Sequence, residues 1–297
     1  MEFERFELNE GDTGYPIQIA DGYEKLPVIY GVGNREILQQ PMLAIIGARR
    51  ATPYGIDLAY QAGRLAAQVG ITVVSGGAMG CDHAASRGAL EAGGTSVIVS
   101  GIGADLVYPK SSEDIFSWVP RAGGAVIALE SWGQYVRRYA FPKRNRLIAA
   151  LATSLLVTEA GKHSGTMTTA DAAMRMGRNI YAYPGSVYSA TSRGTNYLIA
   201  NGAELILDAA DLASRLSLDF GVHFNQNEVK LPRRGEILSA LVANPYSARE
   251  LASKITSTPL TIIDTLTMYE EEGYIVRMLD GRYTVTARGF HAIGTKE

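Results

Sequence analysis

A glycine-rich stretch at residues 75–82, Ser-Gly-Gly-Ala-Met-Gly-Cys-Asp, has the composition of an anion-binding turn. It follows an apolar run at 71–74 and precedes a helix-like segment at 84–90. A turn that opens a helix presents free backbone N–H groups, to which the helix dipole adds positive potential. No Lys-Ser/Thr pair follows the glycines, so the stretch predicts a phosphate or carboxylate site rather than an ATP loop. The alternative is a tight turn whose glycines serve only backbone geometry.

The densest basic stretch lies at residues 137–146, Arg-Arg-Tyr-Ala-Phe-Pro-Lys-Arg-Asn-Arg. Its cations are interleaved with two aromatic side chains, a combination that favours single-stranded nucleic acid. Cations follow the backbone of such a strand, and aromatic rings stack on its bases. Duplex DNA would need an element shaped for a groove. A solvated charged loop is the alternative.

Two further groups could hold phosphate beside the glycine-rich turn. Arg49 and Arg50 directly follow an apolar run, and a guanidinium pairs with phosphate through a planar fork of donors. The alternative for these arginines is a solvated surface. Residues 162–166, Lys-His-Ser-Gly-Thr, precede a predicted helix and form a second loop-to-helix anion site.

The carboxylates are the candidates for catalysis. Glu159 is the best of them, and Asp82 with Glu159 could form a pair for hydrolysis. No Gly-x-Ser-x-Gly motif surrounds Ser164, so a nucleophilic serine is not indicated. The favoured alternative is that both acids accept hydrogen bonds from backbone N–H groups and order the loops.

The elements that position these residues alternate between apolar strands and helices. This order predicts an α/β domain at residues 42–216 with a parallel sheet covered on both faces. The predicted strands are 43–47, 71–74, 96–99, 125–129, 155–157, 179–183 and 204–207. The glycine-rich and basic segments all follow strands, and ligands of such sheets bind at the carboxyl ends of strands. We therefore expect a single site along one rim.

Two segments flank this domain. Residues 1–41 are expected to be an extended, turn-rich lead-in that packs on the rest of the chain. Residues 217–233 have the composition of a linker, and residues 234–290 predict three short helices and a hairpin, the pattern of a winged helix. Its would-be recognition helix, 259–272, contains no Lys or Arg, so it is predicted to contact protein rather than DNA.

Composition limits the class of protein. The chain has 297 residues, 46% hydrophobic and 20% charged, with a formal net charge of −2, which argues against a general basic coat but not against a local patch. No apolar run is long enough for a membrane span, and the acidic N-terminus does not resemble a secretory signal. Cys81 is the single cysteine, and the four histidines lack metal-ligand spacing. A cytoplasmic protein without a metal site is expected.

In its motifs the chain resembles the DprA family, also called Smf, of DNA-processing proteins. The matching segments occur in order: Ile-Gly-Ala-Arg at 46–49 with Thr52 and Tyr-Gly at 54–55, the turn at 75–82, Phe-Pro-Lys-Arg-Asn-Arg-Leu-Ile-Ala at 141–149, Glu-Ala at 159–160, Ser-Gly-Thr at 164–166, Thr-Ala at 169–170, Tyr-Pro-Gly at 183–185, Gly-Thr-Asn at 194–196, Leu-Ile at 198–199 and Gly-Ala at 202–203. Together they cover about residues 15–208.

The resemblance implies an extended Rossmann-like, doubly wound parallel sheet followed by a small winged-helix domain. It also implies a homodimer that binds single-stranded DNA and loads the RecA recombinase onto it during natural transformation and recombination, without catalysis or a cofactor. By motif position, Arg49, Arg138 and Phe141 are similar to the family's DNA-contacting residues. The full predicted DNA-binding set is Gly47, Arg49, Arg50, Thr52, Ser75, Gly76, Gly77, Gly80, Asp82, Arg138, Phe141, Lys143, Arg144, Asn145, Arg146, Lys162, Ser164, Gly165 and Thr166.

The chain also departs from this family. The first 41 residues leave little room for the N-terminal helical domain that the family often has. The usual Glu-x-Pro-Pro-Gly-like stretch is replaced by Glu-Ser-Trp-Gly-Gln-Tyr at 130–135. An alternative function is a nucleotide-processing enzyme similar to phosphoribohydrolases, although their Pro-Gly-Gly-x-Gly-Thr-x-x-Glu signature is not found. A duplex-DNA regulator acting through the winged helix is a third possibility.

Overall fold

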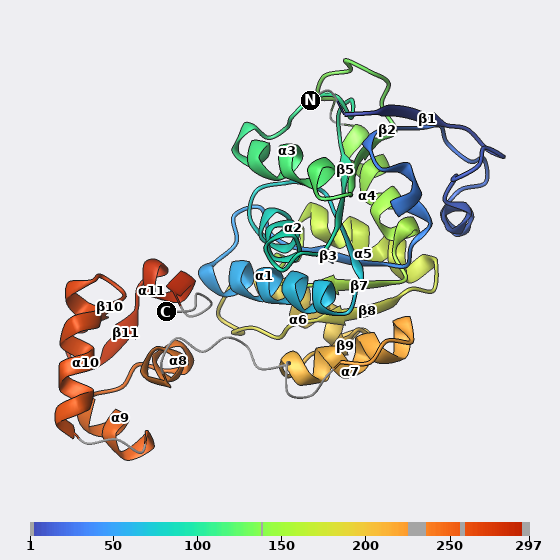
Figure 1. Cartoon of the computed structure of the whole chain (residues 1–297). Coiled ribbons are helices and arrows are strands. Elements are labelled where there is room, and N and C mark those ends of the chain that lie inside the picture. The colour runs from blue at the N-terminus through green and yellow to red at the C-terminus, as the bar shows by residue number, and fades with distance from the viewer. Residues whose placement is uncertain (1–2, 138, 225–235, 256–258, 293–297) are drawn as a thin grey trace. The chain divides into compact units, whose positions relative to one another are not determined.

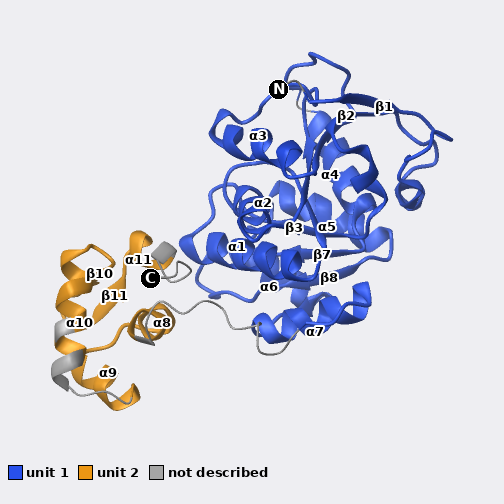
Figure 2. Cartoon of the chain, viewed as in Figure 1, with its two compact units in different colours: residues 1–229 blue, residues 230–297 orange. Residues whose placement is uncertain are grey.

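The computed structural model describes residues 3–137, 139–224, 236–255 and 259–292. The chain divides into two compact units, residues 1–229 and 230–297, which are described separately (Figure 2). The larger unit contains an α/β sheet, and the smaller one contains short helices and a hairpin (Figure 1). In the described part of the chain, no helix combines the length and apolar character needed to cross a membrane.

The sheet of the larger unit has nine strands in the order β1-β2-β6-β5-β4-β3-β7-β8-β9. Strands β3 to β9 are parallel, which confirms the predicted mostly parallel α/β architecture. Their bounds are β1 Arg5–Leu8, β2 Ile29–Gly33, β3 Met42–Ile46, β4 Thr72–Ser75, β5 Ser96–Ser100, β6 Ala125–Ala128, β7 Ser154–Val157, β8 Asn179–Ala182 and β9 Glu204–Leu205.

Helices cover both faces of this sheet. In β3, Met42, Ala44 and Ile46 join one core with α4, α5 and α6, whereas Leu43 and Ile45 join another with α1, α2 and α7. Burial on both faces explains why residues 42–46 are continuously apolar. The bounds are η1 Ile17–Gly22, η2 Arg35–Gln39, α1 Pro53–Gln68, α2 Cys81–Glu91, η3 Lys110–Ser112, α3 Glu113–Arg121, α4 Ala140–Leu151, α5 Gly165–Arg175, α6 Arg193–Ala200 and α7 Ala209–Phe220.

The predicted lead-in is part of the sheet. β2 pairs antiparallel with β6, and β1 pairs antiparallel with β2, so both extend the sheet beyond its parallel part. Their side chains Phe6, Leu8 and Ile29 are buried in the same core as α4. The short and turn-rich sequence of 1–41 predicted packing but not strand pairing, because pairing depends on the edge that β6 offers.

Two boundaries differ from the sequence-based prediction. α4 begins at Ala140 rather than at Arg144, because Pro142 in the first helical turn removes only an N–H that has no partner within the helix. α7 was not predicted and runs through Phe220, so the first four residues of the predicted linker 217–233 are helical. Phe141 and Lys143 therefore stand on a helix and not on a loop.

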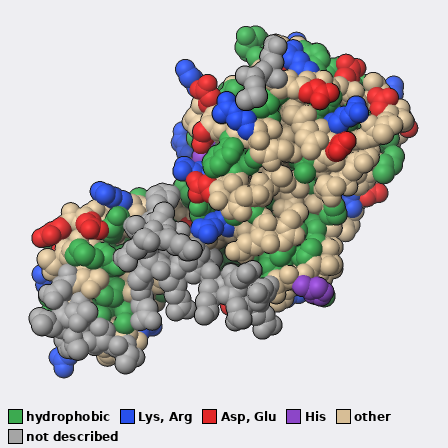
Figure 3. Space-filling view, in the orientation of Figure 1, with side chains coloured by type: hydrophobic (Ala, Val, Ile, Leu, Met, Phe, Trp, Pro, Cys, Tyr) green, Lys and Arg blue, Asp and Glu red, His purple; other side chains and the backbone are tan. Residues whose placement is uncertain are grey.

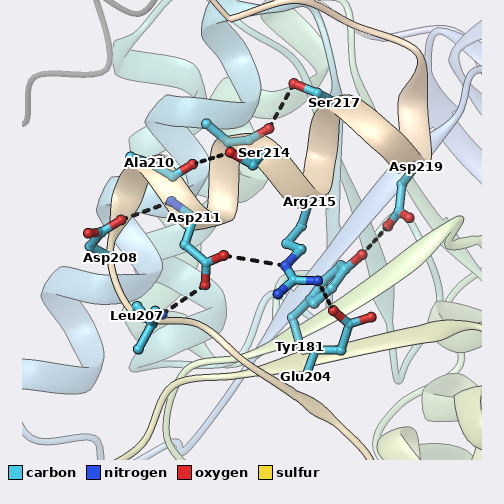
Figure 4. A network of polar contacts seen from close by, with 11 residues as sticks. Tyr181, Glu204, Leu207, Asp208, Ala210, Asp211, Ser214, Arg215, Ser217 and Asp219 are labelled. Carbon is cyan, nitrogen blue, oxygen red and sulfur yellow. Dashed lines mark hydrogen bonds and ion pairs between the residues drawn. The ribbon is translucent and has the colours of Figure 1, made fainter.

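α7 is held to the sheet by a network of polar contacts (Figure 4). Asp219 accepts hydrogen bonds from the hydroxyl of Tyr181 (2.8 Å) and from the amide of Asn179 (2.7 Å), both on β8. Arg215 forms ion pairs with Glu204 and with Asp211. Because Tyr181 is almost fully buried, its hydroxyl depends on Asp219 for a partner.

We predict that Asp219→Ala lowers the free energy of unfolding of the larger unit by about 1–3 kcal/mol, because the hydroxyl of Tyr181 would be left buried without a partner. Both tryptophans, Trp118 and Trp132, lie in this unit, so their fluorescence during urea unfolding reports on it alone. The double variant with Tyr181→Phe should recover part of the loss. Ser214→Ala, at an exposed position of α7, should change the value by less than about 0.5 kcal/mol; an equal loss in this control would contradict the prediction.

The smaller unit contains α8 Glu236–Ala243, α9 Ala248–Lys254, α10 Pro259–Glu271, β10 Ile275–Arg277, β11 Tyr283–Val285 and α11 Ala287–Ala292. Leu238, Leu251, Ile262 and Leu266 form its core. β10 and β11 pair as an antiparallel hairpin. Three helices followed by a hairpin agree with the predicted winged-helix order. The protein-contact role of α10 stays a prediction.

Candidate functional site

A pocket of about 500 Å³ opens at the carboxyl ends of the parallel strands. It is formed by the segments that follow β3, β4, β7 and β8, together with the N-terminal halves of α4 and α5. Its lining residues are Ile46, Gly47, Ala48, Arg49, Arg50, Ala78, Asp82, Arg144, Asn145, Ser164, Gly165, Thr166, Thr169 and Thr191. A cavity therefore lies at the rim where the strand order predicts a site, and most of the predicted segments contribute to it.

A buried ion pair lies at the base of this pocket. The guanidinium Nη1 of Arg144 is 4.0 Å from a carboxylate oxygen of Asp82, and both side chains are more than nine-tenths buried. Burial raises the pKa of Asp82, while the Arg144 charge and backbone N–H groups, among them that of Gly76 at 3.2 Å, act in the opposite direction. Burial and the nearby charge of Arg49 lower the pKa of Arg144, which remains a cation at neutral pH.

This buried cation is only partly satisfied. Nη1 of Arg144 also donates to the side-chain oxygen of Asn145 at 3.1 Å, but Nε is buried without a hydrogen-bond partner. A buried guanidinium with an unused donor and a distant carboxylate is electrostatically undercompensated. The pocket that it lines is consequently suited to an anion.

The predicted glycine-rich turn is shaped by close approach. A Cβ on Gly76 would lie 1.9 Å from Nη1 of Arg144, so only glycine leaves room for the guanidinium. Gly80 has φ of 81°, and its Cβ would lie 2.4 Å from the carbonyl oxygen of Ala48. Cys81 follows it into the core, where burial raises the pKa of its thiol to about 12. The turn therefore provides the space that the Arg144 guanidinium occupies, and Cys81 is not a reactive thiolate.

The N-terminus of α5 forms another wall of the pocket. Ser164 is the N-cap residue, and its hydroxyl oxygen is buried without a hydrogen-bond partner. Thr166 donates to the carbonyl oxygen of Gly47 (2.9 Å), and the amide of Asn145 donates to that of Gly165 (3.1 Å). These bonds tie β3, α4 and α5 together. A helix N-terminus and a free hydroxyl therefore point to the same anion as Arg144 does.

An aromatic surface adjoins the pocket. The Phe141 ring is half-buried against Gly101; the guanidinium of Arg49 lies 5.2 Å above its centroid, and the Tyr108 ring is 6.2 Å away. A second, small cavity of about 50 Å³ lies among these groups and shares Arg49, Ala78 and Arg144 with the larger pocket. The arginines of the pocket and an aromatic ring are thus contiguous.

Some predicted contacts are buried inside the fold. Ser75 is fully buried, and its hydroxyl donates to the carbonyl oxygen of Ile45 (2.6 Å). Gly77 adopts φ of 65° and faces Ile98 and Phe116, which lie in a core beneath the rim. Both residues shape the turn from below instead of facing a ligand, which corrects the expectation that they contact DNA.

Glu159 has a structural role at the N-terminus of α1. Its carboxylate accepts hydrogen bonds from the backbone N–H (2.8 Å) and the hydroxyl (3.0 Å) of Thr52, the N-cap of α1. It also fills the space above Gly55, where a Cβ would lie 2.1 Å from its oxygen. Neither Glu159 nor Thr52 lines the pocket. The loop-ordering role considered above describes Glu159 better than catalysis does.

The other basic residues of the predicted set that the structure describes do not line the pocket. Lys143 lies 5.0 Å above the Tyr139 ring, and Arg146 lies 5.1 Å above the ring of Tyr23. Lys162 lies 5.0 Å above the Tyr197 ring. Arg138 lies outside the described residues. α4 therefore directs Arg144 inward and its other cations outward, because these side chains leave a helix in different directions.

Three residues that the structure brings to this site are absent from the predicted DNA-binding set. Gly101 and Tyr108 belong to the segment after β5, and Thr191 follows β8. The strand order does predict that both segments lie on the rim, because each follows the carboxyl end of a strand, but it does not indicate which of their side chains reach the site. The same rim has no cluster of three metal-ligating side chains, as is true throughout the described residues.

The family model of DNA recombination-mediator protein A matches residues 8–217. This chain belongs to that family. The match covers strands β2 to β9, both cavities and most of α7, so the site described above lies inside the region that the family model matches.

Relatives in several bacteria support this membership. DNA processing protein DprA of Streptococcus pneumoniae is 31% identical over 71% of this chain and 74% of its own length. A putative DNA processing protein DprA of Mycobacterium tuberculosis is 33% identical over 83% of this chain, which spans 64% of that relative. Protein Smf of Escherichia coli is 30% identical, and the chain spans 56% of its length. The chain is therefore a member of a DNA-processing family and is similar to only part of its longer relatives.

Solved structures of the family have the same fold. The crystal structure of S. pneumoniae DprA matches with a TM-score of 0.66 and 29% identity over 75% of each chain. DNA processing protein A from Helicobacter pylori, whose structure was described for its single-stranded DNA binding mode, matches with a TM-score of 0.65 and 28% identity. It covers 75% of this chain and all of its own.

A substitution at Gly76 tests whether the Arg144 guanidinium needs the space that this glycine leaves. We predict that Gly76→Ala lowers the free energy of unfolding of the larger unit by about 3 kcal/mol, because a methyl group would push the guanidinium away from buried Asp82. Urea unfolding followed by tryptophan fluorescence measures this loss. Gly161→Ala is the matched control, since its Cβ would meet nothing closer than 3.5 Å. If both variants unfold like the wild type, Gly76 is not required for the ion pair.

Proposed function

We propose that this chain binds single-stranded DNA without sequence preference and delivers it to a RecA-type recombinase. The observation that carries the proposal is the joining of an anion pocket to a stacking ring through Arg49 and Arg144. A free phosphate or nucleotide would need only the pocket. A strand needs repeated phosphate contacts and exposed aromatic surface together.

The contacts of a strand follow from the site. A backbone phosphate would bind between Arg144, Ser164 and the N-terminus of α5, all of which line the pocket. The neighbouring base would stack at the Phe141 ring beside the guanidinium of Arg49. No group in this arrangement is directed at the hydrogen-bonding edge of one particular base, which supports binding of any sequence.

The proposed activity is binding and not catalysis. The two carboxylates considered for hydrolysis are engaged: Asp82 with Arg144, and Glu159 with Thr52. Neither is left free to activate water beside a bound phosphate. The nucleotide-processing alternative would therefore need another acid or base, and release of free base from AMP by the purified protein would be the result that supports it.

Different observations support a recombinase partner and a homodimer. The family is described as a recombination mediator, and this supports a partner that assembles on single strands, namely RecA. Exposed apolar side chains support a homodimer. Leu207, just before α7, is 76% exposed, and Leu218, on α7, is 81% exposed, so a second copy of the chain could cover both. The setting would be the cytoplasm during natural transformation, where incoming strands are single.

We predict that Arg49→Ala weakens binding of a fluorescent oligothymidylate about tenfold and reduces the slope of log affinity against log salt by about 0.7, the share of one phosphate contact. Fluorescence anisotropy at several salt concentrations measures both. Arg175→Ala removes an exposed charge at the other end of α5 and should leave both values unchanged. Equal binding by the wild type and Arg49→Ala at every salt concentration would refute the assignment. Arg138→Ala, which the sequence also predicts to weaken binding, belongs in the same series.

For the recombinase, the expected outcome is faster replacement of single-strand-binding protein by RecA on a circular single strand when this protein is present. RecA's ATP hydrolysis reports the replacement. Arg49→Ala should lose the acceleration in proportion to its loss of DNA affinity, whereas Arg175→Ala should keep it. Tight DNA binding without any acceleration would remove RecA from the proposal and leave the binding activity in place.

A further inference from the structure

A second pair of a cation and an aromatic ring lies beside the pocket. The ammonium group of Lys162 is 5.0 Å from the centroid of the Tyr197 ring. Lys162 stands in the loop that leads to the pocket residues Ser164 and Gly165, and Tyr197 lies in α6, which begins just after the pocket residue Thr191. The pair is thus connected to the pocket through two separate segments of the chain.

Backbone contacts hold these two segments together. The N–H of Gly194, in the first turn of α6, donates to the carbonyl oxygen of Ala160 at 2.7 Å. A Cβ on Gly194 would lie 2.6 Å from that oxygen, so the approach requires glycine. The hydroxyl of Tyr54 donates to the carbonyl oxygen of Pro184 (2.8 Å), which anchors the start of the segment before α6. These contacts fix the start of α6, and with it the backbone that carries Tyr197.

The rings of this region are open to solvent. Tyr197 is exposed by 45%, and Tyr188, in the segment before α6, by 93%. Exposed tyrosine rings beside a lysine are an arrangement that single-stranded nucleic acids use, with a base on the ring and a phosphate at the cation. The pair of Arg49 with Phe141 has the same composition and nearly the same separation, 5.2 Å.

The two pairs approach the pocket from different walls. Arg49 and Phe141 adjoin it through the segments after β3 and β6 and the small cavity. Lys162 and Tyr197 adjoin it through the segments after β7 and β8, which lie beyond β3 on the other side of the sheet order. A strand whose phosphate sits in the pocket can therefore extend over either pair.

We infer that Tyr197 and Lys162 form a second base-stacking platform, so that a bound strand runs from Phe141 across the pocket onto Tyr197. The inference rests on the proposed function and adds residues and a direction to it. A base stacks on the Tyr197 ring while Lys162 contacts the adjoining phosphate. The platform recognises single-stranded DNA by its flat bases and its charge, so it adds length to the binding site without adding sequence preference.

The test is the dependence of affinity on oligothymidylate length, measured by anisotropy from about 4 to about 16 nucleotides, the range of such sites. For the wild type, affinity should rise as the strand becomes long enough to reach both platforms. Tyr197→Ala should weaken binding of the long strands about fivefold to tenfold, the lower part of the effect of one stacked base. It should leave the shortest bound strand unaffected, and Tyr197→Phe, which keeps the ring, should behave as the wild type.

Matched charge variants complete the test. Lys162→Ala should weaken only the long strands, whereas Arg64→Ala, which also removes a cation stacked on a tyrosine but on α1, should have no effect. If Tyr197→Ala binds every length as the wild type does, or loses affinity equally at every length, the platform is refuted. If Tyr197→Ala refutes the platform but Arg49→Ala still weakens DNA binding in the same experiment, the proposed function stands without the platform. A wild-type protein that binds no single-stranded DNA would refute the proposed function itself.

Discussion

The buried pair of Arg144 with Asp82 is the interaction on which the rim of this sheet depends. It joins the first turn of α2, which follows the glycine-rich turn after β4, to the second turn of α4, and Asn145 continues the connection to α5. Gly76 has to be glycine because the guanidinium occupies the space of a side chain. Since removing one partner of a buried pair leaves an uncompensated charge, the turn, α4 and α5 are constrained together.

The same pair explains why a chain with a net charge of −2 can offer an anion site. Arg144 has a carboxylate at 4.0 Å and a donor without a partner, so its charge is not cancelled where the pocket opens. Low dielectric surroundings strengthen this local field, whereas exposed charges elsewhere are screened. In the view of Figure 3, acidic, basic and apolar side chains are mixed over the larger unit, and that face carries no continuous basic coat.

Rigidity is the second property that the fold supplies. Phe141 stands in the first turn of a helix against Gly101, and Thr166 and Asn145 hold the neighbouring walls by hydrogen bonds. Residues held in place before binding lose little conformational freedom when a ligand arrives. A preformed rim of this kind is suited to a flexible strand, because the strand then contributes most of the ordering.

The sequence by itself determined the α/β architecture, the rim and most of the segments that line the pocket. These follow from local signals: continuous apolar runs mark strands that are covered on both faces, and glycine and basic residues follow the ends of those strands.

Only the tertiary structure decided which side chain of a segment faces the pocket. Arg144 and Arg146 are near neighbours on one helix, yet one is buried at Asp82 and the other lies over Tyr23. Ser75, Thr52 and Glu159 have the chemistry of a site but serve the core and a helix cap, because their partners come from distant parts of the chain. Likewise, the pairing of β1 and β2 and the position of Tyr108 depend on edges and surfaces that exist only once the sheet has formed.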